Sequence, residues 1–245
     1  SNESVETGFS LPRVFRFNAD GSRDFSYASP HFATSPRFMT LQPDGKLLVV
    51  ATSGSSANGG IPIMARLNPD GSPDGSFIQP VLSTNGSIFA PPVVDPAGRI
   101  YVGGIFSTIN GVARPAVARL SPNGAVDTGW TPSGFTLTSS SQIRGLALQT
   151  QGANAGKLLV AGNGGSTGFG GSVNAIAVRA NGTIAVGGTF TTLGNTSLTN
   201  FAVLTATGAR SSVPASSSTV NAIATEADGL LLIGGSFATF NSVSR

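Results

Sequence analysis

A repeated unit constrains the fold of this 245-residue sequence more than any other feature. The unit is two apolar, alternating runs joined at a turn glycine, and its best copies, 174–190 and 221–237, end in Gly-Gly-x-Phe. Looser copies occupy 37–52, 90–106 and 144–162. Asp-Gly or Asn-Gly between alternating apolar runs is typical of a β-hairpin, because the turn needs positive φ. The sequence therefore predicts a hairpin at each copy.

A second unit lies between copies of the first. It is a short strand, a turn glycine and, three residues later, an Asp. It occurs at 17–24, 67–74 and 120–127, and a degenerate copy lies at 201–208. The turn glycines of the first unit lie at 45, 98, 156, 182 and 229, so three of the four steps are 47 to 58 residues. Four short strands in about 50 residues is the spacing of a β-propeller blade.

These spacings predict an all-β fold, a β-propeller of about five blades with four antiparallel strands each, in one domain over 1–245. The blade around 143–171 is expected to lack its outer hairpin, because the following step has only 26 residues. The chain starts with an unpartnered outer unit, 14–25, and ends just after an unpartnered inner one, 219–237. We expect the N-terminal strands to join the last blade and close the ring. The alternative is an excerpt of a longer array.

Residues 103–124, Gly-Gly-Ile-Phe-Ser-Thr-Ile-Asn-Gly-Val-Ala-Arg-Pro-Ala-Val-Ala-Arg-Leu-Ser-Pro-Asn-Gly, resemble the bacterial delta-60 repeat. The stretches 66–72 and 41–46 are similar to it as well. The resemblance implies a propeller fold in a secreted or cell-surface bacterial protein. It brings no activity or catalytic motif with it.

Composition argues against several function classes. The chain has no Cys, His31 is its only His, and its eight Asp all lie at or next to the predicted turns. We therefore expect no catalytic residues, no metal site, no cofactor and no enzymatic activity. A net charge of +3 without a basic cluster argues against nucleic acid, and no apolar run is long enough to insert into a membrane. The Gly-Gly pairs, 103–104, 187–188 and 234–235, predict close backbone approach or bulges rather than a phosphate loop.

One position can be followed around the predicted ring, at the start of each innermost strand on the face with the longer loops. Counted back from the turns, it holds Arg37, Ala90, Arg144, Asn174 and Asn221. Two guanidiniums and two amides there could bind a carboxylate, a phosphate or a sugar. Alternatively, they pair with neighbouring strand-end carbonyls.

The leading functional prediction is a non-enzymatic, extracellular or cell-surface binding module that docks an unknown protein or glycan on the long-loop face. One alternative is a carbohydrate-binding or carbohydrate-active propeller that uses the channel mouth. The other is a purely structural spacer.

Overall fold

The structure is a computed structural model of the whole chain. It describes residues 14–30, 32, 34–51, 63–133, 137–138, 140–163, 169–212, 214–226 and 228–244. Within these ranges every regular element is a β-strand, apart from one 3-10 turn, Gly152–Asn154, which lies among the extra residues of the third hairpin. No helix in the described part of the chain has the length and apolar character needed to cross a membrane.

Five inner hairpins form the framework, and each is antiparallel. Their strands are β1 (Pro36–Leu41) with β2 (Leu47–Ala51), β4 (Ser87–Ile88) and β5 (Val93–Val94) with β6 (Ile100–Ile105), β10 (Gln142–Leu148) with β11 (Leu158–Asn163), β12 (Val173–Val178) with β13 (Ile184–Gly188), and β18 (Val220–Thr225) with β19 (Leu231–Gly235). Each hairpin turns at a glycine of positive φ: Gly45, Gly98, Gly156, Gly182 and Gly229, at 77° to 86°. Glycine is favoured there because it has no Cβ to clash.

Outer strands pair with three of these hairpins. They are β3 (Met64–Leu67) on β2, β9 (Val117–Leu120) on β6, and β16 (Phe201–Leu204) with β17 (Arg210–Ser212) on β13. We call each inner hairpin with its outer strands a blade, numbered 1 to 5 along the chain. The expected fourth strand is a single bridge in blades 1 and 2, Leu67 to Pro73 and Leu120 to Val126. Blades 3 and 5 have two strands each in the described residues.

Short hairpins follow three of the inner hairpins, and the first two lie in segments, 107–114 and 191–199, that the sequence assigns to longer loops. They are β7 (Thr108–Ile109) with β8 (Val112–Ala113), β14 (Thr192–Leu193) with β15 (Thr196–Ser197), and β20 (Thr239–Phe240) with β21 (Val243–Ser244). The loop interpretation is wrong for these two segments, because each contains a pair of short strands. Asn110 and Gly111 both have positive φ, as an Asn-Gly hairpin turn requires.

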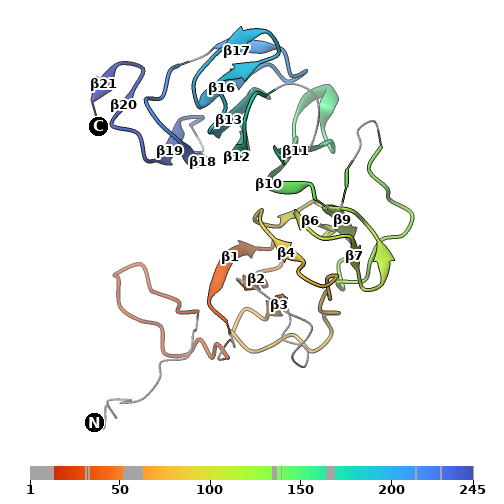
Figure 1. Cartoon of the computed structure of the whole chain (residues 1–245). Coiled ribbons are helices and arrows are strands. Elements are labelled where there is room, and N and C mark those ends of the chain that lie inside the picture. The colour runs from red at the N-terminus through yellow and green to blue at the C-terminus, as the bar shows by residue number, and fades with distance from the viewer. Residues whose placement is uncertain are drawn as a thin grey trace.

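The blades follow one another around an arc (Figure 1). Contacts join β6 to β10, β10 to β12 and β12 to β18, and the Thr40 hydroxyl donates to the Pro92 carbonyl between blades 1 and 2 at 2.8 Å. Apolar clusters lie between and within the blades; the largest joins blades 1 and 2 around Leu48, Ile100 and Phe106. The architecture is therefore all-β and propeller-like.

The arc is open between blade 5 and blade 1 (Figure 1), so the structure differs from the closed ring that the sequence predicts. The N-terminal outer unit does not pair with β19. It contacts blade 1, where the Ala28 N–H donates to the Asp70 carbonyl at 2.8 Å. The physical reason is that an outer unit docks on the following blade through turn backbone, and this contact forms without the inner hairpin.

Candidate functional site

The four polar residues predicted from the repeat all lie at breaks in strand pairing. The register between first and second strands shifts between Pro36 and Phe38, Ile143 and Gly145, Val173 and Ala175, and Val220 and Ala222. The residues passed over are Arg37, Arg144, Asn174 and Asn221. Each is thus the extra residue of a β-bulge, which redirects a side chain out of the regular alternation of the strand.

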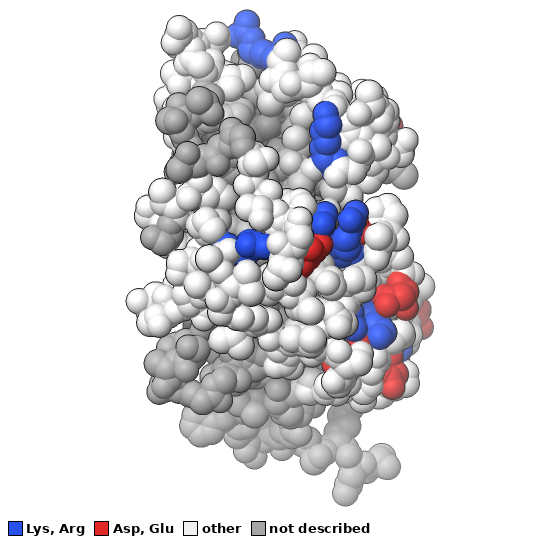
Figure 2. Space-filling view, turned by 90° about the vertical axis from the view of Figure 1, so that its right-hand side faces the viewer, with Lys and Arg blue, Asp and Glu red and all other residues white. Residues whose placement is uncertain are grey.

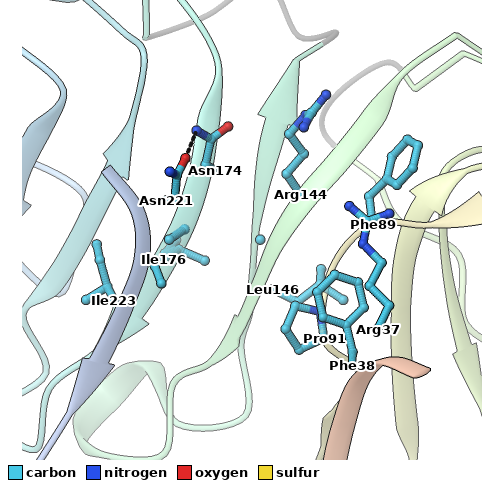
Figure 3. A pocket seen from close by; sticks show the side chains of 13 residues that line it. Arg37, Phe38, Phe89, Pro91, Arg144, Leu146, Asn174, Ile176, Asn221 and Ile223 are labelled. Atoms are coloured by element: carbon cyan, nitrogen blue, oxygen red, sulfur yellow. Dashed lines mark hydrogen bonds between the residues drawn. The ribbon is translucent and has the colours of Figure 1, made fainter. Parts of the chain in front are cut away.

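These bulge residues meet at one pocket (Figure 3). Its volume is about 370 Å³, and all five blades contribute to its wall. The apolar part of the lining comes from Phe38, Phe89, Pro91, Leu146, Ile176 and Ile223. None of the described residues that line it is acidic. Arg37, Phe89 and Arg144 gather on one side, and Asn174 and Asn221 lie together on the other (Figure 3). The structure brings the four residues together, and ligand binding by them stays a prediction.

In blade 2 the equivalent position is Phe89, and the sequence-based assignment of Ala90 is wrong. The N–H groups of Phe89 and Ala90 both donate to the Gly103 carbonyl, at 3.0 and 3.2 Å, which marks Phe89 as the extra residue of the bulge. Ala90 is fully buried. Counting back from the turn fails because blade 2 has one more residue, in the Pro91-Pro92 segment, between bulge and turn. Aligning Ser87 with Ser172 of blade 4 and counting two residues forward would have identified Phe89, as it does Asn174.

The two arginines of the pocket lie against the Phe89 ring. The guanidinium carbons of Arg37 and Arg144 are 5.2 and 5.7 Å from its centroid, and Arg37 is also 5.0 Å from the Phe38 ring. These distances are typical of cation–π contacts. Neither arginine forms an ion pair with a described acid. The pocket therefore carries positive charge that no protein carboxylate in the described residues neutralises.

Hydrogen bonding at the pocket is incomplete. Arg144 donates from Nη2 to Gln142 Oε1 at 2.9 Å, whereas its Nε is buried and has no partner in the described structure. A buried N–H without a partner is costly, so this donor would gain from an acceptor in the pocket. Asn174 Nδ2 donates weakly to the Val220 carbonyl at 3.4 Å and to Asn221 Oδ1 at 3.5 Å. Among the described residues, the alternative of pairing with strand-end carbonyls is therefore observed at Asn174, whereas Arg144 pairs with a side chain.

The acids lie away from the pocket, in the turns. Asp20 and Asp70 each accept from the backbone N–H two residues on, at 2.9 Å, which confirms the turn role predicted for them. On the face shown in Figure 2, most acidic side chains lie toward one edge, beside Lys and Arg side chains. The described residues hold no group of three His, Cys, Asp or Glu that could bind a metal ion, and His31 lies outside them.

Three acids have a further role that the sequence interpretation missed. Asp24, Asp74 and Asp127 each form an ion pair with the Arg eight residues earlier, at 2.7 to 2.8 Å; these are Arg16, Arg66 and Arg119. The signal was present, because all three outer units carry an Arg at that spacing. These carboxylates are therefore part of the blade structure.

Comparison with known families supports the propeller fold. Residues 42–77 and 96–129 match the family described as a domain of unknown function (DUF5122) beta-propeller. These two segments belong to blades 1 and 2. No curated protein matches the chain in sequence. This match confirms the propeller part of the predicted resemblance, and the assignment to the delta-60 repeat stays a prediction.

Two solved structures align with most of this chain. One is a candidate gluconolactonase, with a TM-score of 0.53 and 15% identity over 93% of this chain and 79% of the other. The other is the extracellular domain of a candidate hybrid two-component system from B. thetaiotaomicron. Its TM-score is 0.48 and its identity 14%, and the alignment covers 86% of this chain and 27% of that one.

The first similarity contradicts the prediction that the chain is not an enzyme. That prediction rests on the absence of Cys, the single His and the placement of the Asp residues in turns. A protein described as a candidate gluconolactonase has the same fold over most of this chain. At 15% identity the similarity shows the fold alone, so it transfers no activity. The prediction that the chain is not an enzyme is therefore withdrawn.

Proposed function

We propose that this chain is a β-propeller module that binds a small organic anion, of the size and polarity of a sugar acid, in the pocket of the five bulges. The observation that carries the proposal is the convergence of Arg37 and Arg144 on one pocket without a described carboxylate partner. Guanidinium groups bind carboxylates strongly because their N–H donors match the two carboxylate oxygens.

Size and lining narrow the ligand class. A volume of about 370 Å³ is near the lower end of ligand pockets, which run from roughly 300 to 1,000 Å³. Arg37 and Arg144 would bind the carboxylate, and the amides of Asn174 and Asn221 offer donors and acceptors for hydroxyl groups on the opposite side. A hydroxylated acid of six or so carbons meets both requirements.

Calorimetric titration tests this assignment. The probes are D-gluconate and D-galacturonate, with D-glucose as the neutral comparison. We expect the acids to bind and the neutral sugar to bind more weakly. Arg144→Ala should weaken acid binding by about tenfold or more, since a hydrogen bond to a charged group contributes roughly 1.5–3 kcal/mol. The double variant R37A/R144A should show no measurable acid binding.

Arg210→Ala is the matched control. Arg210 is exposed on β17, so this substitution removes the same charge at a position away from the pocket. It should bind the acids as the unaltered chain does. Equal acid affinity in R37A/R144A and the unaltered chain would contradict the proposal. Hydrolysis of δ-gluconolactone is measured in parallel. If the unaltered chain hydrolyses the lactone and Arg144→Ala does not, the same pocket is the site of catalysis.

Phe89 is expected to position the two arginines, which yields a separate prediction. Phe89→Leu keeps apolar bulk but removes the ring face, and cation–π contacts contribute about 0.5–1 kcal/mol each at exposed sites. We expect acid affinity to fall about fivefold in Phe89→Leu and to stay unchanged in Phe89→Tyr. If Phe89→Leu bound the acids as well as Phe89→Tyr does, the positioning role would be wrong.

We also propose an extracellular or cell-surface setting, with a protein or glycan partner on the long-loop face. The resemblance of residues 103–124 to the delta-60 repeat supports the setting. The bulges lie at the starts of the inner strands, beside the longer loops, which supports a partner that reaches the pocket from that side. Fractionation of producing cells tests the setting, and recovery only from the cytosol would contradict it.

A further inference from the structure

The pocket of the five bulges has a polar tier and an apolar tier, and the proposed function uses mainly the first. The polar tier consists of the four polar bulge residues, Arg37, Arg144, Asn174 and Asn221. Every other described residue that lines the pocket is apolar or glycine. The lining is therefore divided by chemistry, and a ligand that fills it has to be divided in the same way.

The apolar tier comes from the same inner strands, farther along each strand. In blades 3, 4 and 5 the residue two positions after the bulge is a large aliphatic one that lines the pocket: Leu146, Ile176 and Ile223. Because a strand rises about 3.3 Å per residue, the two tiers lie roughly 7 Å apart. In Figure 3 these aliphatic side chains lie below those of Arg144, Asn174 and Asn221.

Small residues separate the two tiers. In the same three blades the residue between the bulge and the aliphatic residue lacks bulk: Gly145, Ala175 and Ala222. A Cβ on Gly145 would lie only 2.9 Å from Ile176 Cγ2. A larger residue at position 145 would thus displace the Ile176 side chain, so the glycine allows this wall of the apolar tier to form.

Phe38 and Pro91 complete the apolar tier on the side of blades 1 and 2 (Figure 3). Phe38 packs against the core cluster that joins these two blades. The Thr40 hydroxyl donates to the Pro92 carbonyl at 2.8 Å, which links β1 to the segment that carries Pro91. The Phe38 ring is therefore held at the pocket wall by both blades, and it offers an aromatic surface to a ligand.

A fully hydroxylated ligand suits only the polar tier. No described side chain of the apolar tier can donate or accept a hydrogen bond. A hydroxyl group placed there would lose its water without gaining a side-chain partner, which is unfavourable. An apolar group in the same place would instead bury its surface against Phe38 and the aliphatic side chains, which is favourable.

We propose that the ligand is a sugar acid that carries an aromatic substituent, as in an aryl glycoside of a uronic acid. This assignment rests on the proposed function and specifies its ligand. The carboxylate binds Arg37 and Arg144, and the sugar hydroxyls lie near Asn174 and Asn221. The aromatic ring occupies the apolar tier beside Phe38.

Calorimetric titration with three matched glycosides tests the assignment. Phenyl β-D-glucuronide carries both groups, methyl β-D-glucuronide lacks the ring, and phenyl β-D-glucoside lacks the carboxylate. We expect phenyl β-D-glucuronide to bind at least tenfold more tightly than methyl β-D-glucuronide, because the ring buries apolar surface that the methyl group does not. Phenyl β-D-glucoside should also bind at least tenfold more weakly than phenyl β-D-glucuronide.

Ile223→Thr tests the apolar tier directly. It keeps a β-branched side chain suited to a strand but places a hydroxyl at the pocket wall. We expect it to weaken phenyl β-D-glucuronide about fivefold and to leave methyl β-D-glucuronide unchanged. Ile233→Thr is the matched control, because Ile233 pairs with Ile223 in the same hairpin, is likewise half-buried in the same apolar cluster, and does not line the pocket.

The outcomes separate this assignment from the proposed function. Equal affinity for phenyl and methyl β-D-glucuronide in the unaltered chain would overturn the aromatic substituent and leave sugar-acid binding intact. An equal loss of phenyl β-D-glucuronide affinity in Ile223→Thr and Ile233→Thr would overturn direct contact with the ring. If neither glucuronide nor D-galacturonate bound, the proposed function would fall as well.

Discussion

Gly188→Ala is expected to lower the free energy of unfolding by about 3 kcal/mol, at the upper end of the roughly 1–3 kcal/mol that overpacking commonly costs. A Cβ at this position would lie 2.0 Å from the Ser172 carbonyl oxygen and 3.0 Å from the Val173 Cα. Both are backbone atoms of the paired strand, so they cannot swing away as a side chain could. Val173 is also paired with Gly188, and relief would break that pairing.

Urea unfolding followed by fluorescence or circular dichroism measures this effect. Blade 5 offers a matched pair, because Gly235 repeats the contact of Gly188 and Gly234 does not. A Cβ on Gly235 would lie 2.1 Å from the Thr219 carbonyl oxygen, whereas one on Gly234 has Ala222 Cβ as its nearest neighbour, at 3.9 Å. Gly235→Ala should destabilise and Gly234→Ala should not. Equal stability of these two variants would show that the close approach is not what the glycine provides.

The Gly-Gly pattern shows how much of the fold a repeat can predict. The Gly-Gly pairs predict close backbone approach or bulges, and the structure shows close approach at the second glycine of two pairs. A Cβ added to Gly104 or Gly188 would lie 2.0 Å from a carbonyl oxygen. The inner turns follow from glycines that need positive φ. Both inferences succeed because they depend on local backbone geometry, and the same local sequence recurs in each copy of the repeat.

The site was predictable only in part, for an equally physical reason. Arg37, Arg144, Asn174 and Asn221 were found by counting from the turns, and that count holds only where no residue is inserted. The Pro91-Pro92 segment of blade 2 shifts the count by one and hides Phe89. Contacts between blades are also invisible to a periodic pattern. Whether the two ends meet depends on the curvature of the whole arc, which no single repeat encodes.

The ion pairs of the outer hairpins form a second repeated device, and Asp74 has the largest number of partners. It accepts from Lys46 Nζ and Arg66 Nε, both at 2.8 Å, and from the Ser76 hydroxyl at 2.6 Å. Arg66 is almost completely buried, and its guanidinium lies 4.6 Å from the Phe77 ring centroid. The hydrogen bonds from Lys46, Ser76 and Arg66 hold the pKa of Asp74 well below its usual range.

Asp74→Asn is accordingly expected to destabilise the protein by about 3–5 kcal/mol at neutral pH, because removing one partner of a buried pair leaves the other charge uncompensated. The native pKa lies below that of the unfolded chain, which is near 3.9. The stabilisation by Asp74 is therefore fully present above about pH 5 and is lost as the pH falls below 4 toward the native pKa. Unfolding free energies at pH 3 and pH 7 should differ more in the unaltered chain than in Asp74→Asn.

Asp44→Asn is the control, because Asp44 is exposed and its turn hydrogen bond to the Lys46 N–H can be made by Asn. A pH dependence in Asp74→Asn as steep as in Asp44→Asn would contradict the assignment of acid sensitivity to the Asp74 cluster.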